Sequence, residues 1–380
     1  MITYFSENPE NDLWREILQY TYEANIKRYS KKHEKEIDED TIACIAGSLL
    51  QAYEYYKSAK EANLQIAPLL LYYGSTNLLY GMANLIKGEI NHIENHGMKI
   101  FIPDEMEFIA DTDVRFLSHE TGGVHVIARI LGFNDDLTGF GDWKTRDFLD
   151  SIAEISREYN TCYEKYNSRI AMLEVINTPE GKVEKVYFNE ENRQLTQQLL
   201  ENVTGFSKSY LHPVDSHDLS NNAFFILRHK LNGKDISEIS YSGQPFLRAS
   251  HTKNSKTITL PTILNMYITL FSLASLCRYY PEKWSPFVLK DTTGERLLIE
   301  KFLFFARRMI PNIVLNLIVD NYVQYTSKKY EPTDTVKLVG EHQVQEMVRK
   351  EINSRMEKEA IRQSNRMFNG GGAKLSLIHI

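Results

Sequence analysis

The chain has 380 residues, which is enough for one large domain or two modest ones. A hydrophobic content of 42% and a charged content of 25% are ordinary for globular proteins and exclude disorder of the whole chain. The formal net charge of −6 argues against a nucleic-acid binder that relies on a generally positive surface. Three scattered cysteines and the absence of a secretory signal pattern at the start exclude a disulfide framework and predict a cytoplasmic protein.

The first quarter of the chain shows clear helical periodicity. Apolar residues recur at intervals of three and four, which predicts helices over residues 10–35, 41–62 and 68–87. Asp38 is a candidate N-cap of the second helix, and Pro68 suits the first turn of the third. After the third helix, residues 98–103 read as a short strand.

The remaining elements are expected as follows: helices over 147–175, 190–203, 260–280, 293–326 and 341–367, and a strand over 183–188. Between them, residues 206–257 are rich in Ser, Asn, Gly, His and Asp and hold short strands at best. The sequence therefore predicts a mainly α protein, a large helical bundle with a few short strands and a C-terminal tail helix. The expected parts are a helical domain over 1–326 with strands within 98–110, 181–190 and 235–260, a basic tail helix over 327–369, and a disordered or artefactual tail over 370–380.

Two uncharged stretches, 62–86 and 257–277, are long enough to cross a bilayer. Both carry several Asn, Ser and Thr residues, which are costly inside a membrane, and neither has a basic cluster on one side. Core helices of a large bundle explain them better, because such helices are hydrophobic all round. We therefore expect no membrane partner, and a membrane-associated helical protein remains an alternative.

Two segments carry a resemblance to a known family. They are residues 67–88 (APLLLYYGSTNLLYGMANLIKG), followed by His96-Gly97-Met98, and residues 273–317, which include LASLCRYYPEKWSPFV and GERLLIEKFLFFARRMIPNIVLNL. Both resemble the YaaC-like family of bacteria, and the similarity extends over most of residues 10–325. The first segment also looks like the paired helices of HEPN domains. The resemblance implies a helical body with a HEPN-like helix pair, and it implies no activity.

HEPN ribonucleases carry an Arg followed after four to six residues by a His, and Arg28 and His33 fit this spacing. The Arg can hold a phosphate while the His transfers a proton. The resemblance thus implies an alternative function, a metal-independent endoribonuclease effector in phage or stress defence. One such spacing is expected by chance in a chain of this composition.

Metal-binding patterns are weak. His92 and His96 are four residues apart and would share a helix face, and the loop 212–218 holds two His and two Asp residues. Helix-end histidines and turn-capping aspartates explain both patterns better than a metal site does. We predict no metal and no cofactor.

Several tyrosines occur in adjacent pairs, such as Tyr72-Tyr73 and Tyr279-Tyr280. Buried tyrosines can line contacts between helices because the hydroxyl still finds a partner there. They can also wall a groove that stacks bases or an aromatic ligand.

Basic residues within apolar surroundings give the strongest functional signal. An unpaired buried guanidinium is very costly, so each such Arg needs either a carboxylate partner or an anionic ligand. The candidate anion pocket comprises Arg228, His229, Arg248, His251, Arg278 and Arg308, and Trp284 is a candidate wall. Structural ion pairs or helix C-caps are the alternative explanation.

These observations predict a regulatory or binding protein that engages a partner or a small anionic ligand such as a phosphate or nucleotide. RNA is a further candidate ligand. A homodimer or a partner protein could be held through the tail helix, 327–369.

Overall fold

The computed structural model describes residues 2–118, 121–133, 136–178, 181–188, 211–214, 223–227, 237–254 and 256–327. The chain divides after Tyr325 into two units, and apart from the last residue of the final strand the features below belong to the first, Met1–Tyr325. The expected helices over 190–203 and 341–367 and the expected tail over 370–380 lie outside the described residues.

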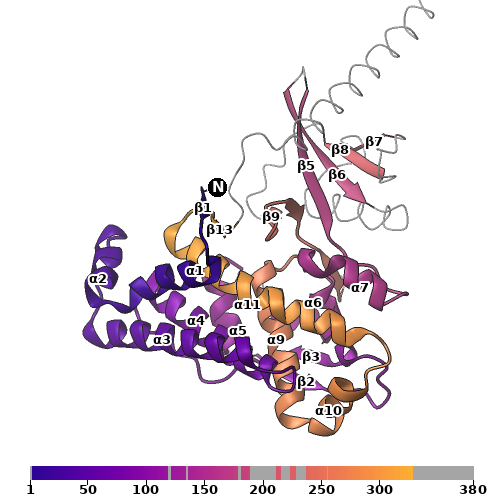
Figure 1. Ribbon diagram of the computed structural model, residues 1–380, viewed down its shortest axis with the longest axis horizontal. Helices are drawn as coiled ribbons and strands as arrows, with labels where there is room; N and C mark the ends of the chain where they lie inside the picture. The colour runs from indigo at the N-terminus through magenta and orange to yellow at the C-terminus, as the bar shows by residue number, and fades with distance from the viewer. Residues whose placement is uncertain are drawn as a thin grey trace, which may run out of the picture. The chain divides into compact units, whose positions relative to one another are not determined.

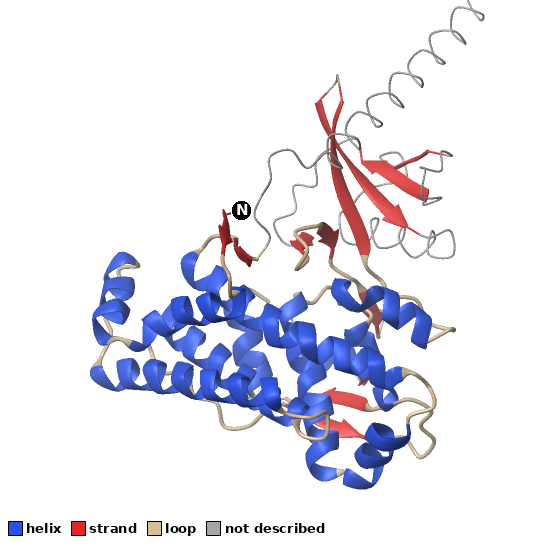
Figure 2. Ribbon diagram, in the orientation of Figure 1, coloured by secondary structure: helices blue, strands red, loops and turns tan. Residues whose placement is uncertain are grey.

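The described chain is mainly helical, as predicted (Figures 1 and 2). The α-helices are α1 (Pro9–Leu18), α2 (Glu23–Lys32), α3 (Glu39–Glu61), α4 (Ala67–Lys87), α5 (Gly123–Ile130), α6 (Thr145–Leu149), α7 (Ser156–Cys162), α9 (Thr262–Tyr279), α10 (Pro281–Lys290) and α11 (Glu295–Val319). Short 3-10 helices cover Gln19–Thr21, Ile109–Asp111, Leu137–Phe140 and Ala153–Ile155.

The strands are short and form several small sheets (Figure 2). They are β1 (Ile2–Phe5), β2 (Met98–Phe101), β3 (Asp113–Phe116), β4 (Trp143–Lys144), β5 (Ala171–Thr178), β6 (Gly181–Phe188), β7 (Leu211–Val214), β8 (Ala223–Leu227), β9 (Ser237–Ile239), β10 (Pro245–Leu247), β11 (His251–Lys253), β12 (Lys256–Ile258) and β13 (Val323–Thr326). The largest sheet has the order β7-β8-β6-β5-β10-β9, and the others are β2-β3-β4, β1-β13 and β11-β12. Strands within 98–110, 181–190 and 235–260 are therefore confirmed.

Helices α3 and α4 pack side by side in an antiparallel pair (Figure 1). Gly74 and Gly81 of α4 allow the close approach, because a Cβ atom at Gly74 would lie 2.8 Å from the ring of Tyr56. At the same contact the Tyr56 hydroxyl and Ser75 Oγ are hydrogen bonded at 2.7 Å, so the buried phenol is satisfied. The pair forms one wall of the helical core.

Helix α9 runs through the centre of the core, against α4, α6, α10 and α11. Every residue from Thr262 to Leu276 is buried, which explains why this stretch lacks charge. Several of its polar side chains are hydrogen bonded inside the protein: Ser272 Oγ lies 2.6 Å from Thr145 Oγ1, and Thr269 Oγ1 donates to the carbonyl oxygen of Asn265 at 2.8 Å. The prediction that this uncharged run is a core helix is confirmed.

Among the described residues, the single helix that is long and apolar enough to span a membrane is α11, and half of its apolar stretch is buried inside the protein. The uncharged runs 62–86 and 257–277 do not meet that criterion.

Three sequence expectations were wrong in detail. The helix expected over 293–326 ends at Val319, and residues 323–326 form β13 instead. Residues 10–35 form two helices rather than one, because a 3-10 turn at Gln19–Thr21 and extended backbone at Tyr22 interrupt them. Residues 147–175 are not one helix: the chain turns after α6, forms α7 and then enters β5. The alternating residues Ala171 and Leu173 are both buried, so this segment has the periodicity of a strand. Helix α10, led by Pro281, was not anticipated.

Candidate anion-binding site

The described members of the predicted basic cluster do not come together in one pocket. Arg248 donates from Nε to Glu238 Oε1 at 2.7 Å, and Glu238 also accepts from the backbone N–H of Thr262 at the start of α9. Arg278 lies at the other end of the same helix. Sixteen residues of helix correspond to about 24 Å, so Arg248 and Arg278 cannot share one small ligand.

His251 is buried next to a carboxylate rather than open to an anion. Its Nε2 atom lies 3.0 Å from Asp150 Oδ1, and only 3% of the residue is exposed. Asp150 also accepts from Arg169 Nε at 3.1 Å and from Ser151 Oγ at 2.7 Å. Three donors around one carboxylate hold the β11 hairpin against α6, so His251 has a structural role.

Arg308 and the candidate wall Trp284 lie in other surroundings, apart from Arg248 and His251. Arg308 lies over the rings of Tyr241 and Phe304, at 4.7 and 5.3 Å from their centroids. Trp284 is fully buried and donates from Nε1 to the carbonyl oxygen of Gln65, so it packs in the core and is not a pocket wall. Arg228 and His229 lie outside the described residues.

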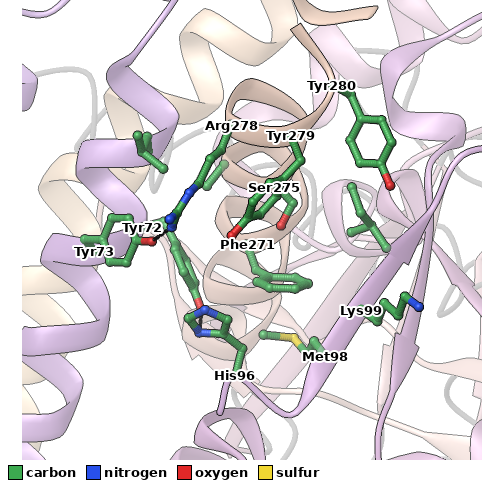
Figure 3. A pocket seen from close by; sticks show the side chains of 13 residues that line it. Tyr72, Tyr73, His96, Met98, Lys99, Phe271, Ser275, Arg278, Tyr279 and Tyr280 are labelled. Carbon is green, nitrogen blue, oxygen red and sulfur yellow. Dashed lines mark hydrogen bonds between the residues drawn. The ribbon is translucent and has the colours of Figure 1, made fainter.

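Arg278, in contrast, lines a pocket between α4, β2 and the last turn of α9 (Figure 3). The pocket has a volume of about 260 Å³. Its walls are Leu69, Tyr72, Tyr73, His96, Met98, Lys99, Ile100, Phe271, Ala274, Ser275, Arg278, Tyr279 and Tyr280. We call this the Arg278 pocket. Three of its lining residues are basic, and none of those described is acidic.

The guanidinium of Arg278 is exposed and donates from Nη1 to the hydroxyl of Tyr73. It also lies 5.0 Å from the ring centroid of Tyr279. Across the described part of the chain no carboxylate pairs with Arg278, whereas Arg115, Arg146, Arg169, Arg248, Arg296 and Arg307 each have one. Its position in the last turn of α9 is favourable for a cation, because it faces the negative end of the helix dipole.

His96 faces Arg278 from the segment between α4 and β2 (Figure 3). Its Nδ1 atom lies 2.7 Å from the hydroxyl of Tyr72, and its ring centroid lies 5.7 Å from that of Phe271. Partial burial and the positive charge of Arg278 both lower the pKa of His96. The imidazole is therefore neutral at pH 7 and can donate or accept one hydrogen bond at Nε2.

Some of these residues are already candidates from the sequence, although not all of them for the same role. The sequence predicts an anion ligand at Arg278, offers His96 as a weak candidate metal ligand, and indicates an aromatic groove or helix contact at Tyr72-Tyr73 and Tyr279-Tyr280. Lys99 was missed. Alternation in 98–103 could have placed its side chain on the outer face of the strand, but not beside Arg278.

The remaining candidates gain no support. Arg28 lies in α2 and donates to Asn25, and His33 packs against the ring of Tyr29 at the end of the same helix. His92 and His96 lie in an irregular segment, so no helix places them on one face. Among the described residues, no three His, Cys, Asp or Glu side chains gather in a way that could hold a metal ion. The aspartates of the loop 212–218 lie outside the described residues.

Comparison with known proteins gives one match. The family model described as YaaC-like protein matches residues 4–318. No curated protein and no solved structure matches the chain. The resemblance to HEPN domains is not confirmed.

Proposed function

This chain belongs to the YaaC-like protein family, and from the Arg278 pocket we propose that it is a regulatory or binding protein that holds a small anionic ligand. One observation carries the proposal: a guanidinium without a described carboxylate partner lines a pocket that has further basic residues and no described acidic one. An anion suits such a site, because Arg pairs best with carboxylate and phosphate oxygens.

The walls of the pocket indicate the rest of the ligand. Tyr72, Phe271 and Tyr279 offer aromatic surface, and Leu69 and Ile100 are aliphatic. The volume of about 260 Å³ lies slightly below the roughly 300–1,000 Å³ of pockets for drug-sized molecules. A ligand with one ring and one anionic group fits this combination better than a nucleoside triphosphate.

The proposed location is the cytoplasm. The free thiols of Cys44, Cys162 and Cys277 support it, because unpaired cysteines are typical of proteins in a reducing compartment.

Thermal unfolding and isothermal titration calorimetry with a panel of small anions test the proposed function. The panel contains inorganic phosphate, benzoate, phenyl phosphate and adenosine monophosphate. A bound anion should raise the melting temperature by mass action, and Arg278→Gln should abolish the rise while the variant stays folded. Arg28→Gln removes an exposed Arg outside the pocket and is the matched control, which should retain binding. If no member of the panel binds, or if both variants lose binding equally, the proposed function is wrong.

A further inference from the structure

The inference concerns the chemical class of the anion, and it rests on the proposed function of the Arg278 pocket. Tyr73 accepts a hydrogen bond from Arg278 through its hydroxyl oxygen, so its own O–H proton remains available. The guanidinium carries five N–H groups, of which one is used in this bond. Two donor groups, from α4 and from α9, therefore meet at one end of the pocket (Figure 3).

The hydrogen bond between Tyr72 and His96 determines whether Nε2 of His96 is a hydrogen-bond donor or an acceptor. Burial raises the pKa of Tyr72 well above its usual value, so the hydroxyl keeps its proton. Either partner could donate in the 2.7 Å contact with His96 Nδ1, and we assign the Tyr72 proton to this contact rather than to the longer one, 3.4 Å to the Tyr267 hydroxyl. A neutral imidazole that accepts at Nδ1 carries its proton on Nε2. Among the described residues nothing occupies Nε2, so His96 presents a hydrogen-bond donor.

The charged groups facing His96 agree with this assignment. Arg278 on α9 is its cationic neighbour, and Tyr72 on α4 is its partner at Nδ1. Lys99 on β2 lines the other end of the pocket, where its ammonium lies 5.1 Å from the ring centroid of Phe101. With no described carboxylate beside it, His96 has nothing to favour its protonated form, and it acts as a neutral donor.

We infer that the anion of the Arg278 pocket is a phosphomonoester on a small ring, bound by Arg278, the Tyr73 hydroxyl and His96 Nε2–H. A carboxylate presents two oxygens in one plane and is satisfied by the guanidinium alone. A phosphomonoester presents three terminal oxygens in three directions and can use donors from three separate elements, α4, the segment before β2, and α9. The ring attached to the phosphate lies against Phe271 and Tyr279.

Phenyl phosphate and benzoate are the matched probes, since they share a ring and differ in the anionic group. Titration calorimetry at pH 7.5 should show phenyl phosphate binding at least tenfold more tightly than benzoate. His96→Ala should weaken phenyl phosphate binding about tenfold or more, as expected for a hydrogen bond to a charged group, and should leave benzoate binding within about threefold. Inorganic phosphate lacks the ring, so its affinity compared with that of phenyl phosphate measures what the ring contributes. Adenosine monophosphate carries a larger group on its phosphate and tests the size of the ligand.

Tyr72 is a positioning residue, and its test uses a spectroscopic readout. Nitrogen-15 chemical shifts of His96 should show a proton on Nε2 in the wild type. Tyr72→Phe removes the hydroxyl and should give a mixture of the two neutral tautomers, with weaker phenyl phosphate binding. A wild-type His96 with its proton on Nδ1 would refute the donor assignment even if the variant fails to fold.

The outcomes distinguish this inference from the proposed function. Benzoate binding as tightly as phenyl phosphate would overturn the phosphomonoester assignment and leave the anion pocket standing. A preference for phosphate that survives His96→Ala would remove His96 from the site. Failure of every probe would overturn both the inference and the proposed function.

Discussion

Glu295 offers a sharp test of the physical reasoning, because it is a carboxylate buried at the first turn of α11. Only 1% of the residue is exposed. It accepts hydrogen bonds from the backbone N–H of Ile109 at 2.6 Å, the backbone N–H of Ala110 at 2.8 Å and the hydroxyl of Tyr163 at 2.7 Å. Burial raises the pKa of Glu295 to about 7, although these three donors oppose the rise.

The raised pKa makes stability depend on pH in a definite direction. An unfolded Glu releases its proton near pH 4.5, whereas the folded protein holds it up to about pH 7. Between these values the folded state binds more protons, so its stability falls as the pH rises and levels off above pH 7. Between pH 5 and pH 8, the titration of Glu295 lowers the free energy of unfolding by about 2–3 kcal/mol.

Glu295→Gln removes the titration and nearly preserves the shape. The new amide faces the N–H of Ile109 with a donor of its own, which costs about 1–3 kcal/mol at any pH. Urea unfolding therefore should show that the variant has a lower free energy of unfolding than the wild type at pH 5. At pH 8 this difference should be about 2–3 kcal/mol smaller, or reversed in sign, because only the wild type loses stability between the two pH values. Glu300→Gln changes an exposed carboxylate on the same helix, paired with Arg296, and should shift stability by less than about 1 kcal/mol at both values. An equal deficit of Glu295→Gln at both pH values would refute the reasoning.

Two further predictions concern stability and are also checked by urea unfolding. Gly74→Ala should cost about 1–2 kcal/mol despite the better helix propensity of Ala, because its Cβ atom would lie 2.8 Å from the facing tyrosine ring. Gly47→Ala, a helical glycine with nothing within 4 Å, should instead stabilise by about 0.5–1 kcal/mol, and equal effects would contradict the close approach of α3 and α4. Asp150→Asn should lower the free energy of unfolding by about 2–3 kcal/mol. This is at the low end for breaking a buried ion pair, because the side chain of Arg169 is 36% exposed and solvent screens its charge. Asp142→Asn breaks an exposed pair and should cost at most about 1 kcal/mol, so a similar loss in both Asp variants would argue against a structural role for the buried network.

The long helices could be predicted because local rules and burial agree there. Asp38 caps α3 by accepting from the N–H of Thr41 at 2.7 Å, and Gly88 ends α4 with φ of 78°. The break at Gln19–Thr21 could not be predicted, because the helical periodicity continues through it without Gly or Pro. The extent of the β5 and β6 sheet was also missed, since β9 and β10 join it from a distant part of the sequence.

The site was partly predictable for a similar reason. The composition around Arg278 indicated a cation in apolar and aromatic surroundings, and that much is correct. Spacing along the chain could not show that Arg248 and Arg278 occupy opposite ends of α9, nor that Glu238 neutralises Arg248. Spacing along the chain also could not show that His96 and Arg278 line the same pocket, because this depends on how α4 packs against α9.

The pairing of β1 with β13 has a consequence for synthesis on the ribosome. The backbone N–H of Ile2 bonds to the carbonyl oxygen of Tyr322, and the rings of Tyr4 and Tyr325 stack at 5.5 Å. At roughly 5–20 residues per second, the first strand waits about 15–60 s for its partner to be translated. During that interval the backbone N–H and C=O groups of Ile2–Phe5 lack the strand with which they pair in the folded protein, so they are open to pairing with other chains. The pairing of β1 with β13 therefore cannot form until the chain has been translated as far as Thr326.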